Sequence, residues 1–256
     1  MQITKYDINT KKITNDIRVA CVSDVHGRPA SKVIEAVRSI KPDLILLAGD
    51  IMEISAEYMQ KRNKNALSFL GEMSKIAPCY YCFGNHELYF THAKIGQPKI
   101  SDPDLRKEHI AIIEKFGIHL INDTEETFEN VHIGGVVCGY DKLENDKNRE
   151  PDIDFLKQFS AVEGFKILLC HYPHYYEKYL KNLDFDLILS GHAHGGQWRF
   201  FGRGVYAPHQ GLFPKYTSGM YGGRFIINRG AVNNAPPIPR FFNPCEIIEI
   251  NIVGKQ

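Results

Sequence analysis

Five short groups of residues in this chain carry aspartate, asparagine or histidine side chains that could bind metal ions. The groups are Asp24-Val25-His26, Gly49-Asp50, Gly84-Asn85-His86-Glu87, Cys170-His171 and Gly191-His192-Ala193-His194. Each follows an apolar run that predicts a buried strand. Oxygen and nitrogen ligands of this kind suit Mn, Fe, Zn or Co. A pair of divalent ions roughly 3.5–4 Å apart also needs a bridging carboxylate, which these groups can supply.

Each group alone has a structural explanation. Asp-x-His is frequent by chance, Gly-Asp is an ordinary turn, and Gly-Asn-His-Glu can simply begin a loop. Five groups that each follow a strand are a stronger indication. Because loops at the carboxyl ends of strands build the sites of open α/β sheets, residues distant in sequence can converge there. The sequence therefore predicts a dinuclear metal centre.

The elements that must position these groups alternate between strand and helix in the first half of the chain. Strands are predicted at 18–23, 43–48 and 78–83, and helices at 31–40, 56–76 and 102–116. Ser31 is the expected cap of the first helix, and Lys41-Pro42 ends it. The first strand, helix and strand make a parallel βαβ unit.

The second half is rich in short strands. They are predicted at 118–121, 131–138, 166–170, 186–190, 224–228 and 246–252. This asymmetry favours mixed sheets flanked by helices over a simple doubly wound sheet.

The order of the five groups resembles the calcineurin-like metallophosphoesterase superfamily, whose pattern is Asp-x-His, Gly-Asp, Gly-Asn-His-Glu, His and Gly-His-x-His. The resemblance spans roughly residues 18 to 250. It implies an α/β fold with mixed sheets, a four-layer αββα sandwich of the metallo-dependent phosphatase type. The dinuclear site would lie at the edge of this sandwich.

The resemblance also implies a role for each residue. One ion would be bound by Asp24, His26 and His194, the other by Asn85, His171 and His192, with Asp50 bridging both. A hydroxide shared by the ions would attack phosphorus in line. His86 would stabilise the phosphoryl oxygens or protonate the leaving group, and Glu87 would orient His86.

Departures from sister groups narrow the resemblance. Ser/Thr protein phosphatases usually continue Gly-Asp with Asp-Arg-Gly and place an arginine before Gly-Asn-His-Glu, where this chain has Ile51 and Phe83. Purple acid phosphatases use a tyrosine three residues after the Gly-Asp aspartate, where this chain has Glu53. Both activities are therefore disfavoured.

A further likeness lies downstream. The signature Gly-His-x-His-Gly-Gly-Gln at 191–197, followed by Asn228-Arg229-Gly230, Pro239-Arg240 and Pro244-Cys245-Glu246, is similar to a bacterial phosphodiesterase subgroup. Cys245 departs from the proline usual there. Members of that subgroup often have an amino-terminal membrane anchor, which we do not expect here.

Residues 191–240 contain no acidic residue and six lysines or arginines. They form either an anion-binding surface or a loop whose cations pair with acids elsewhere, and the sequence leaves both open. Arg28, Gln197 and Arg229 are the candidate substrate-binding residues. Seven aromatic residues between Trp198 and Tyr221 could stack a base or meet an acyl chain, but packing within the loop is expected for most of them.

Composition bounds the remaining possibilities. The 256 residues suit one domain, 1–256, and a formal charge of +1 argues against a surface for long nucleic acid. Charged residues fill the first twenty positions and no apolar run approaches membrane-spanning length, so we expect a cytoplasmic protein without an integral membrane segment. The six cysteines are expected to be mostly buried free thiols.

The expected function is hydrolysis of a small phosphorylated substrate by a dinuclear metal-dependent phosphodiesterase. The alternatives are a phosphomonoesterase or a nucleotide-sugar pyrophosphatase, and a scaffold that binds without turnover.

Overall fold

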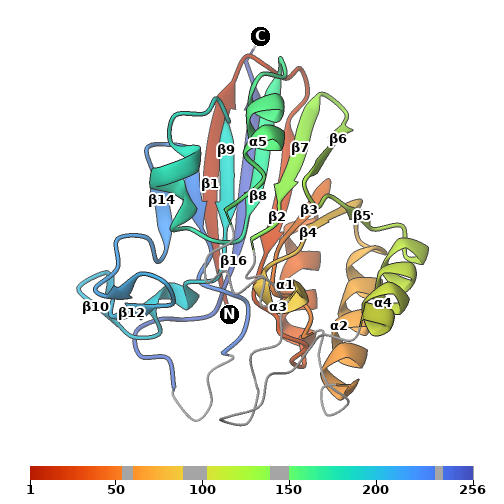
Figure 1. Ribbon diagram of the computed structural model, residues 1–256, viewed down its shortest axis with the longest axis vertical. Helices are drawn as coiled ribbons and strands as arrows, with labels where there is room; N and C mark the ends of the chain where they lie inside the picture. The colour runs from red at the N-terminus through yellow and green to blue at the C-terminus, as the bar shows by residue number, and fades with distance from the viewer. Residues whose placement is uncertain (54–59, 89–102, 139–149, 234–238, 256) are drawn as a thin grey trace.

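The computed structural model describes residues 1–53, 60–88, 103–138, 150–233 and 239–255. Two six-stranded sheets make up its centre (Figure 1). The first has the order β1 (Gln2–Thr10), β16 (Glu246–Gly254), β2 (Ile17–Val22), β3 (Leu44–Ala48), β4 (Cys79–Cys82) and β5 (His119–Leu120). The second has the order β14 (Gly219–Tyr221), β15 (Phe225–Ile227), β9 (Leu187–Ser190), β8 (Phe165–Cys170), β7 (Val131–Val136) and β6 (Thr124–Phe128).

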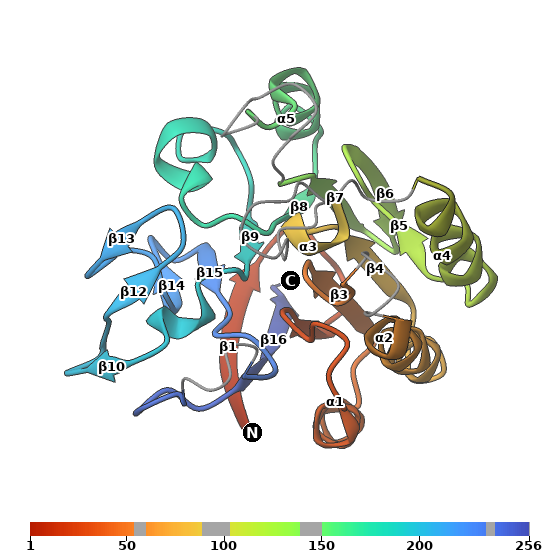
Figure 2. The same cartoon turned by 60° about the horizontal axis from the view of Figure 1, so that its bottom comes forward.

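Helices cover the outer face of each sheet (Figure 2). The first sheet is covered by α1 (Ser31–Ile40), α2 (Gln60–Met73) and α4 (Pro103–Lys115), and the second by α5 (Ile153–Ser160) and the π-helical turn η2 (Tyr176–Leu180). Apolar side chains fill the space between the sheets and the space under each helical layer. The expected four-layer αββα sandwich of mixed sheets is confirmed.

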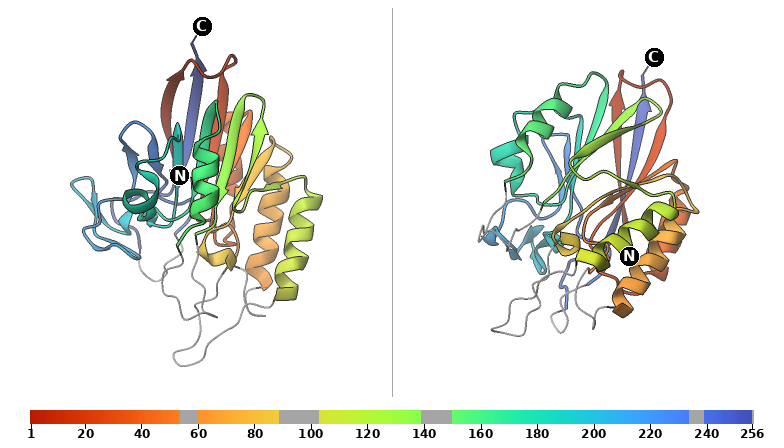
Figure 3. Two further views of the ribbon diagram at one scale, coloured as in Figure 1. Left: turned by 45° about the horizontal axis from the view of Figure 1, so that its top comes forward. Right: turned by 45° about the vertical axis from the view of Figure 1, so that its right-hand side comes forward.

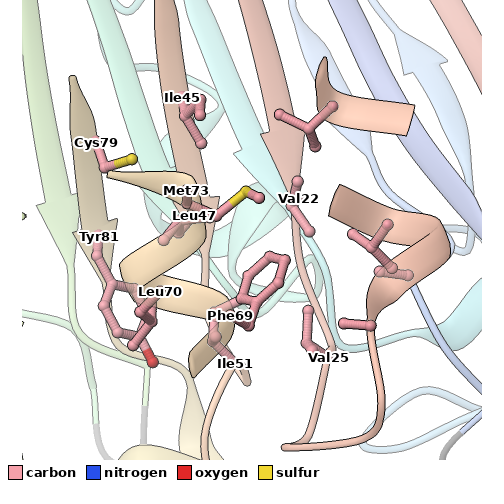
Figure 4. Packing of buried hydrophobic residues seen from close by; sticks show 14 of the residues in the cluster. Val22, Val25, Ile45, Leu47, Ile51, Phe69, Leu70, Met73, Cys79 and Tyr81 are labelled. Atoms are coloured by element: carbon pink, nitrogen blue, oxygen red, sulfur yellow. The ribbon is translucent and has the colours of Figure 1, made fainter. Parts of the chain in front are cut away.

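The core under α1 and α2 shows how the sequence builds these layers. Phe69 and Met73 of α2 pack against Ile45 and Leu47 of β3, and Tyr81 of β4 lies beside them (Figure 4). All five residues of β3 are buried, as expected for a parallel strand covered on both faces.

Cys79 and Cys82 occupy opposite faces of β4. Cys79 packs in the core under the helices and Cys82 in the core between the sheets. In the described part of the chain all six cysteines are free, and five of them are buried. The expectation of buried free thiols is thus confirmed for all but Cys245, which is half-buried.

The predicted strands and helices are found, with changes at their ends. Part of the helix predicted at 56–76 and the start of that at 102–116 lie outside the described residues. The capping prediction was wrong, because Ala30 occupies the cap position of α1 without a side-chain hydrogen bond and Ser31 is already helical. Lys41 does end α1, in a left-handed conformation. The sequence interpretation missed β1, β6 and α5.

The parallel strands of both sheets direct their carboxyl ends to one end of the molecule. There β2, β3 and β4 run parallel, as do β7, β8 and β9. The short helix α3 (Asn85–Leu88) lies at this end, between β3, β4 and β8 (Figure 2). Small hairpins project beside it: β10 (Arg199–Phe200) with β11 (Arg203–Gly204), and β12 (Tyr206–Ala207) with β13 (Gly211–Leu212) (Figure 3).

No helix within the described ranges has both the length and the apolar composition needed to cross a membrane.

Candidate metal centre

The structure brings the predicted ligands together in two groups at the carboxyl ends of the strands. Asp24, His26 and His194 offer ligand atoms that all lie within 4.8 Å of one another. The same holds for Asp50, His171 and His192. These groups correspond to the two ligand sets expected from the sequence, and Asn85 begins α3 beside them.

Asp50 lies at the centre of both groups. Its Oδ2 is 3.0 Å from Nε2 of His171 and 3.9 Å from Nε2 of both His26 and His86. Its Oδ1 accepts a hydrogen bond from the backbone N–H of His86. Burial acts to raise the pKa of Asp50, but the nearby imidazoles, His171 foremost, hold this pKa well below its usual value. Asp50 is therefore a carboxylate with one oxygen facing the histidines.

Unpartnered polar atoms show that the site fits metal ions. Within the described residues, Nε2 of His26, His171 and His192 and Oδ1 of Asn85 are buried without a hydrogen-bond partner. Leaving four such atoms unpaired in one place is costly unless a ligand satisfies them. The Nδ1 of His171 donates to the carbonyl of Ala48 at 2.7 Å, so that Nε2 is the nitrogen directed into the site.

The backbone at these ligands is strained. Asp24, His26, Asp50, His192 and His194 all have positive φ, between 46° and 66°. Residues other than glycine rarely adopt this left-handed conformation, and clusters of it are typical of functional sites. Strands that stop here in a left-handed turn aim these side chains across the end of the sandwich.

Two glycines of the motifs are required because other residues of the site lie too close to leave room for a Cβ atom. A Cβ at Gly84 would collide with Oδ1 of Asp50 and with the ring of His171. Gly49 has a φ of +85°, and a Cβ there would meet the His171 ring as well. The glycines in Gly-Asp and Gly-Asn-His-Glu therefore let the β3 and β4 loops close against His171.

Glu53 is a site residue that the sequence interpretation missed. Its carboxylate is buried and accepts hydrogen bonds from Nδ1 of His26 and from Nδ1 of His86, each at 2.9 Å. Burial acts to raise the pKa of Glu53, but the two histidines hold it far below its usual value. The available signal was a lone acid in an apolar loop shortly after Asp50.

Glu87 does not orient His86, contrary to expectation. Its carboxylate accepts hydrogen bonds from four backbone N–H groups and from the Tyr81 hydroxyl. Three of these N–H groups belong to residues 50–52 and one to Gly84. Glu87 therefore fixes the loop that carries Asp50, and Glu53 fixes His86.

His194 is held differently from the other histidines. Nη2 of Arg240 lies 3.1 Å from its Nδ1, and because a guanidinium only donates, Nδ1 is the acceptor. Burial lowers the pKa of His194 to about 3, so its ring is neutral. Its Nε2 faces Oδ1 of Asp24 at 3.4 Å. An ion bound to Nε2 would require the ring proton on Nδ1, which would then no longer accept a hydrogen bond from Arg240.

A second layer of rings surrounds His192. Tyr172 lies 4.4 Å and His209 5.4 Å from it, measured between ring centroids, and His174 contacts both. Nδ1 of His174 is buried without a partner, and burial lowers the pKa of His174 to about 4. These rings keep the His192 side of the site neutral and largely apolar. The sequence interpretation passed over His174 and His209.

Most cations of the acid-free segment are paired rather than available to an anion. Arg229 forms an ion pair with Glu246 at 2.7 Å, and Lys215 one with Glu177. Arg224 and Arg240 donate to backbone carbonyls. The structure thus favours pairing with groups elsewhere over an extended anion-binding surface. In particular, it directs Arg229 toward Glu246.

The other two candidate substrate-binding residues lie in the chain segments that carry ligands. Arg28 follows His26, is influenced by the charge of Glu53, and has a buried Nε without a hydrogen-bond partner. Gln197 follows the His194 turn, and its backbone carbonyl accepts a hydrogen bond from Asn243.

Comparisons with known proteins agree with this geometry. The family model for calcineurin-like phosphoesterases matches residues 17–196. An uncharacterized metallophosphoesterase of Campylobacter jejuni is 25% identical over 265 residues, covering all of this chain. The chain spans only 64% of that relative's length.

A second relative carries a more specific name. The UDP-2,3-diacylglucosamine pyrophosphatase LpxG of Chlamydia muridarum is 26% identical, over 90% of this chain and 82% of its own. One crystal structure shares the fold with a TM-score of 0.50 at 11% identity, over 84% of this chain and 91% of its own. The ordered motifs, their convergence on Asp50 and the family match lead to one conclusion: the chain belongs to the calcineurin-like phosphoesterase family, whose members are metal-dependent phosphoester hydrolases.

Proposed function

We propose that this chain is a dinuclear metal-dependent phosphodiesterase. The observation that carries the proposal is the meeting of two ligand groups at Asp50, with unpartnered imidazole nitrogens directed between them. The similarity of residues 191–197 to the bacterial phosphodiesterase subgroup with the Gly-His-x-His-Gly-Gly-Gln signature also supports the proposal.

In this proposal one ion is held by Asp24, His26 and His194, and the other by Asn85, His171 and His192, with Asp50 shared. Mn, Fe, Zn and Co all suit this donor set. Two bound ions supply an activated water nucleophile and offset negative charge on the phosphoryl group.

His86 is the proposed proton donor. Asp50 and Glu53 outweigh the effect of burial and raise the pKa of His86 to about 9 in the metal-free protein. Since Nδ1 is held by Glu53, Nε2 is the nitrogen that would donate a proton to the leaving group. Hydrolysis adds the oxygen of one water to phosphorus and breaks the bond to the leaving oxygen, which takes its proton from Nε2 of His86.

The charge near the site favours a diester over a monoester. A monoester carries close to two negative charges at neutral pH, and a diester carries one. Among the described arginines, Arg229 is neutralised by Glu246, and Arg240 is occupied by carbonyls and His194. Arg62 is paired with Glu53 at 3.4 Å, and Arg28, two residues after His26, is the candidate cation for a substrate with one negative charge.

A second candidate function is hydrolysis of a nucleotide-sugar pyrophosphate. The name of the Chlamydia relative, which specifies a pyrophosphatase for a UDP-linked diacylated sugar, favours it. Each phosphorus of such a substrate has one ester bond, one anhydride bond and one negative charge, so the charge at the phosphorus that is attacked is the same as in a diester. A non-catalytic scaffold is disfavoured, because His86 and all seven candidate ligands are in place.

The test combines metal content with substrate preference. Protein reconstituted with Mn or Zn should hold about two ions per chain and hydrolyse a bis-aryl phosphate faster than the mono-aryl phosphate. Asp50→Asn should lose most metal and activity, whereas His86→Ala should keep its metal and lose turnover. Absence of bound metal after reconstitution would refute the proposal, and preference for the monoester would replace it with a phosphomonoesterase.

A further inference from the structure

The hairpins that follow His194 form a lobe with unusually exposed aromatic side chains. We define the aromatic lobe as residues 198–213 together with Phe241 and Phe242. Phe201 is fully exposed, Phe242 is 79% exposed and Phe213 is 73% exposed. The most exposed other apolar side chains of the lobe are Leu212, Phe200, Tyr206 and Phe241. Loop packing, expected for these aromatics from sequence, is confirmed for Tyr216 but wrong for Phe201 and Phe213.

These side chains protrude where the backbone itself is strained. Phe201, Phe213 and Phe242 have φ values of 50°, 51° and 51°. A bulky residue in this left-handed conformation is an outlier, and glycine or asparagine would relieve it. Three turns therefore hold a largely exposed phenylalanine at a cost to the free protein, and Phe242 contacts the ring of Phe200.

The lobe is a projection with a shallow apolar hollow. The hollow measures about 370 Å³ and is lined by Arg199, Phe200, Phe201, Gly202 and Phe242. In Figure 3 the hairpins extend away from the two sheets. The exposed phenylalanines around this hollow, Phe200, Phe201 and Phe242, are the kind of apolar surface that marks an interaction site.

The charge next to the exposed rings indicates the kind of partner. Residues 198–213 contain no Asp or Glu, and the exposed Arg203 lies in the same hairpin as Phe201. Separate aromatic tips beside a cation suit the interface of an anionic bilayer, where aromatic rings enter the headgroup region and arginine meets lipid phosphates. A rigid protein partner would instead need a pocket for each tip.

The lobe is also fastened to the candidate metal centre. Arg199 Nη1 donates to the carbonyl of Gly195 at 2.9 Å, and Asn243 Nδ2 donates to that of His194 at 2.7 Å. The backbone N–H of Val205 donates to the carbonyl of Gly196. Whatever the lobe binds is therefore held close to His194.

We propose that the aromatic lobe docks this protein on the surface of anionic membranes by inserting Phe201, Phe213 and Phe242. The docking itself is independent of turnover. Its consequence, that the enzyme meets phosphodiesters presented at the membrane surface, rests on the proposed function.

Vesicle binding tests the docking, with Trp198 as a native reporter. Trp198 is the single tryptophan of the chain and lies in the lobe, 38% exposed. The full chain should sediment with vesicles of phosphatidylcholine and phosphatidylglycerol, and brominated acyl chains should quench its fluorescence. Binding to phosphatidylcholine alone should be weaker.

Matched variants distinguish vesicle binding through the aromatic lobe from nonspecific adsorption of the protein. The triple variant replaces Phe201, Phe213 and Phe242 with asparagine, which tolerates the left-handed backbone conformation. Its affinity for anionic vesicles should fall at least about tenfold. Phe116→Asn, at an exposed phenylalanine after α4, should bind as the unchanged protein does. Arg203→Glu should weaken binding to anionic vesicles and leave that to phosphatidylcholine unchanged.

Several results of these experiments would contradict membrane docking. Failure of the unchanged protein to bind anionic vesicles, undiminished binding by the triple variant, or binding without quenching of Trp198 would each overturn the proposal. Self-association through the lobe in place of vesicle binding would also overturn it. Hydrolysis of a soluble bis-aryl phosphate should be the same in the triple variant, so a failed phosphodiesterase assay and a failed docking assay are distinguishable.

Discussion

The carboxylate of Glu53 accepts a hydrogen bond from Nδ1 of His86 at a distance of 2.9 Å, and this contact fixes the ring of the proposed proton donor. The other carboxylate oxygen holds His26, a candidate metal ligand. The buried side chain of Glu53 thus orients both the proposed proton donor, His86, and the candidate metal ligand His26.

Glu53→Gln should lower kcat by about 10- to 100-fold, because residues that orient ligands and catalytic rings contribute on this scale. The neutral amide removes one of the two charges, those of Asp50 and Glu53, that raise the pKa of His86. Turnover measured at saturating metal, together with metal content, checks this. Glu126→Gln, which alters the exposed His119–Glu126 pair, is the control and should have no effect. An unchanged kcat in Glu53→Gln with full metal would assign His86 another orienting group.

Glu87→Gln should destabilise the metal-free protein by roughly 1–3 kcal/mol, since the amide NH₂ would face N–H donors that now meet a carboxylate oxygen. Urea unfolding in the presence of a chelator measures the free energy of unfolding. Exposed Glu163→Gln provides the comparison and should change little. Equal stability of the two variants would mean that the loop carrying Asp50 does not depend on Glu87.

Gly84→Ala should lower the free energy of unfolding by about 1–3 kcal/mol, as overpacking does in tight cores. It should also weaken metal binding, because the added methyl group meets Asp50 and His171. Gly71→Ala is the matched substitution. Its methyl group would make only ordinary contact with Phe116, and it should stabilise α2 by up to about 1 kcal/mol. Calorimetric metal titration and thermal unfolding of both variants distinguish these effects, and tight metal binding by Gly84→Ala would contradict the close approach.

Metal ions should raise the thermal stability of the protein, because they satisfy nitrogen atoms that are buried and unpaired without them. At a free metal concentration 100 times Kd the gain is about 2.7 kcal/mol. Melting curves with Mn or Zn and with a chelator measure it. Asp50→Asn should show no such gain, and equal shifts in both proteins would place the bound metal elsewhere.

The sequence was sufficient for the ligand groups because geometry leaves them little freedom. When parallel strands such as β2, β3 and β4 lie side by side, the residues that follow them must meet at one edge. Asp24 and Asp50 could therefore be brought together in prediction although no local pattern connects them. The side chains of those apolar runs fill the space between the sheets and the space under each helical layer.

The partners of those ligands could not be predicted in the same way. Glu87 is adjacent to His86 in sequence, but successive residues on a helical turn point in different directions, so adjacency was misleading. Glu53 reaches His86 only through the path of its loop. Strand β1 was missed because its exposed and covered positions alternate at a sheet edge, where the apolar signal is weak.

The position of β16 has a consequence for synthesis. This strand, residues 246–254, lies between β1 and β2, pairing parallel with the first and antiparallel with the second. Translation must reach residue 254 before the two earliest strands can be joined in one sheet. Until then the nascent chain exposes the edges of β1 and β2, and chaperones that shield unpaired strands would act during this interval.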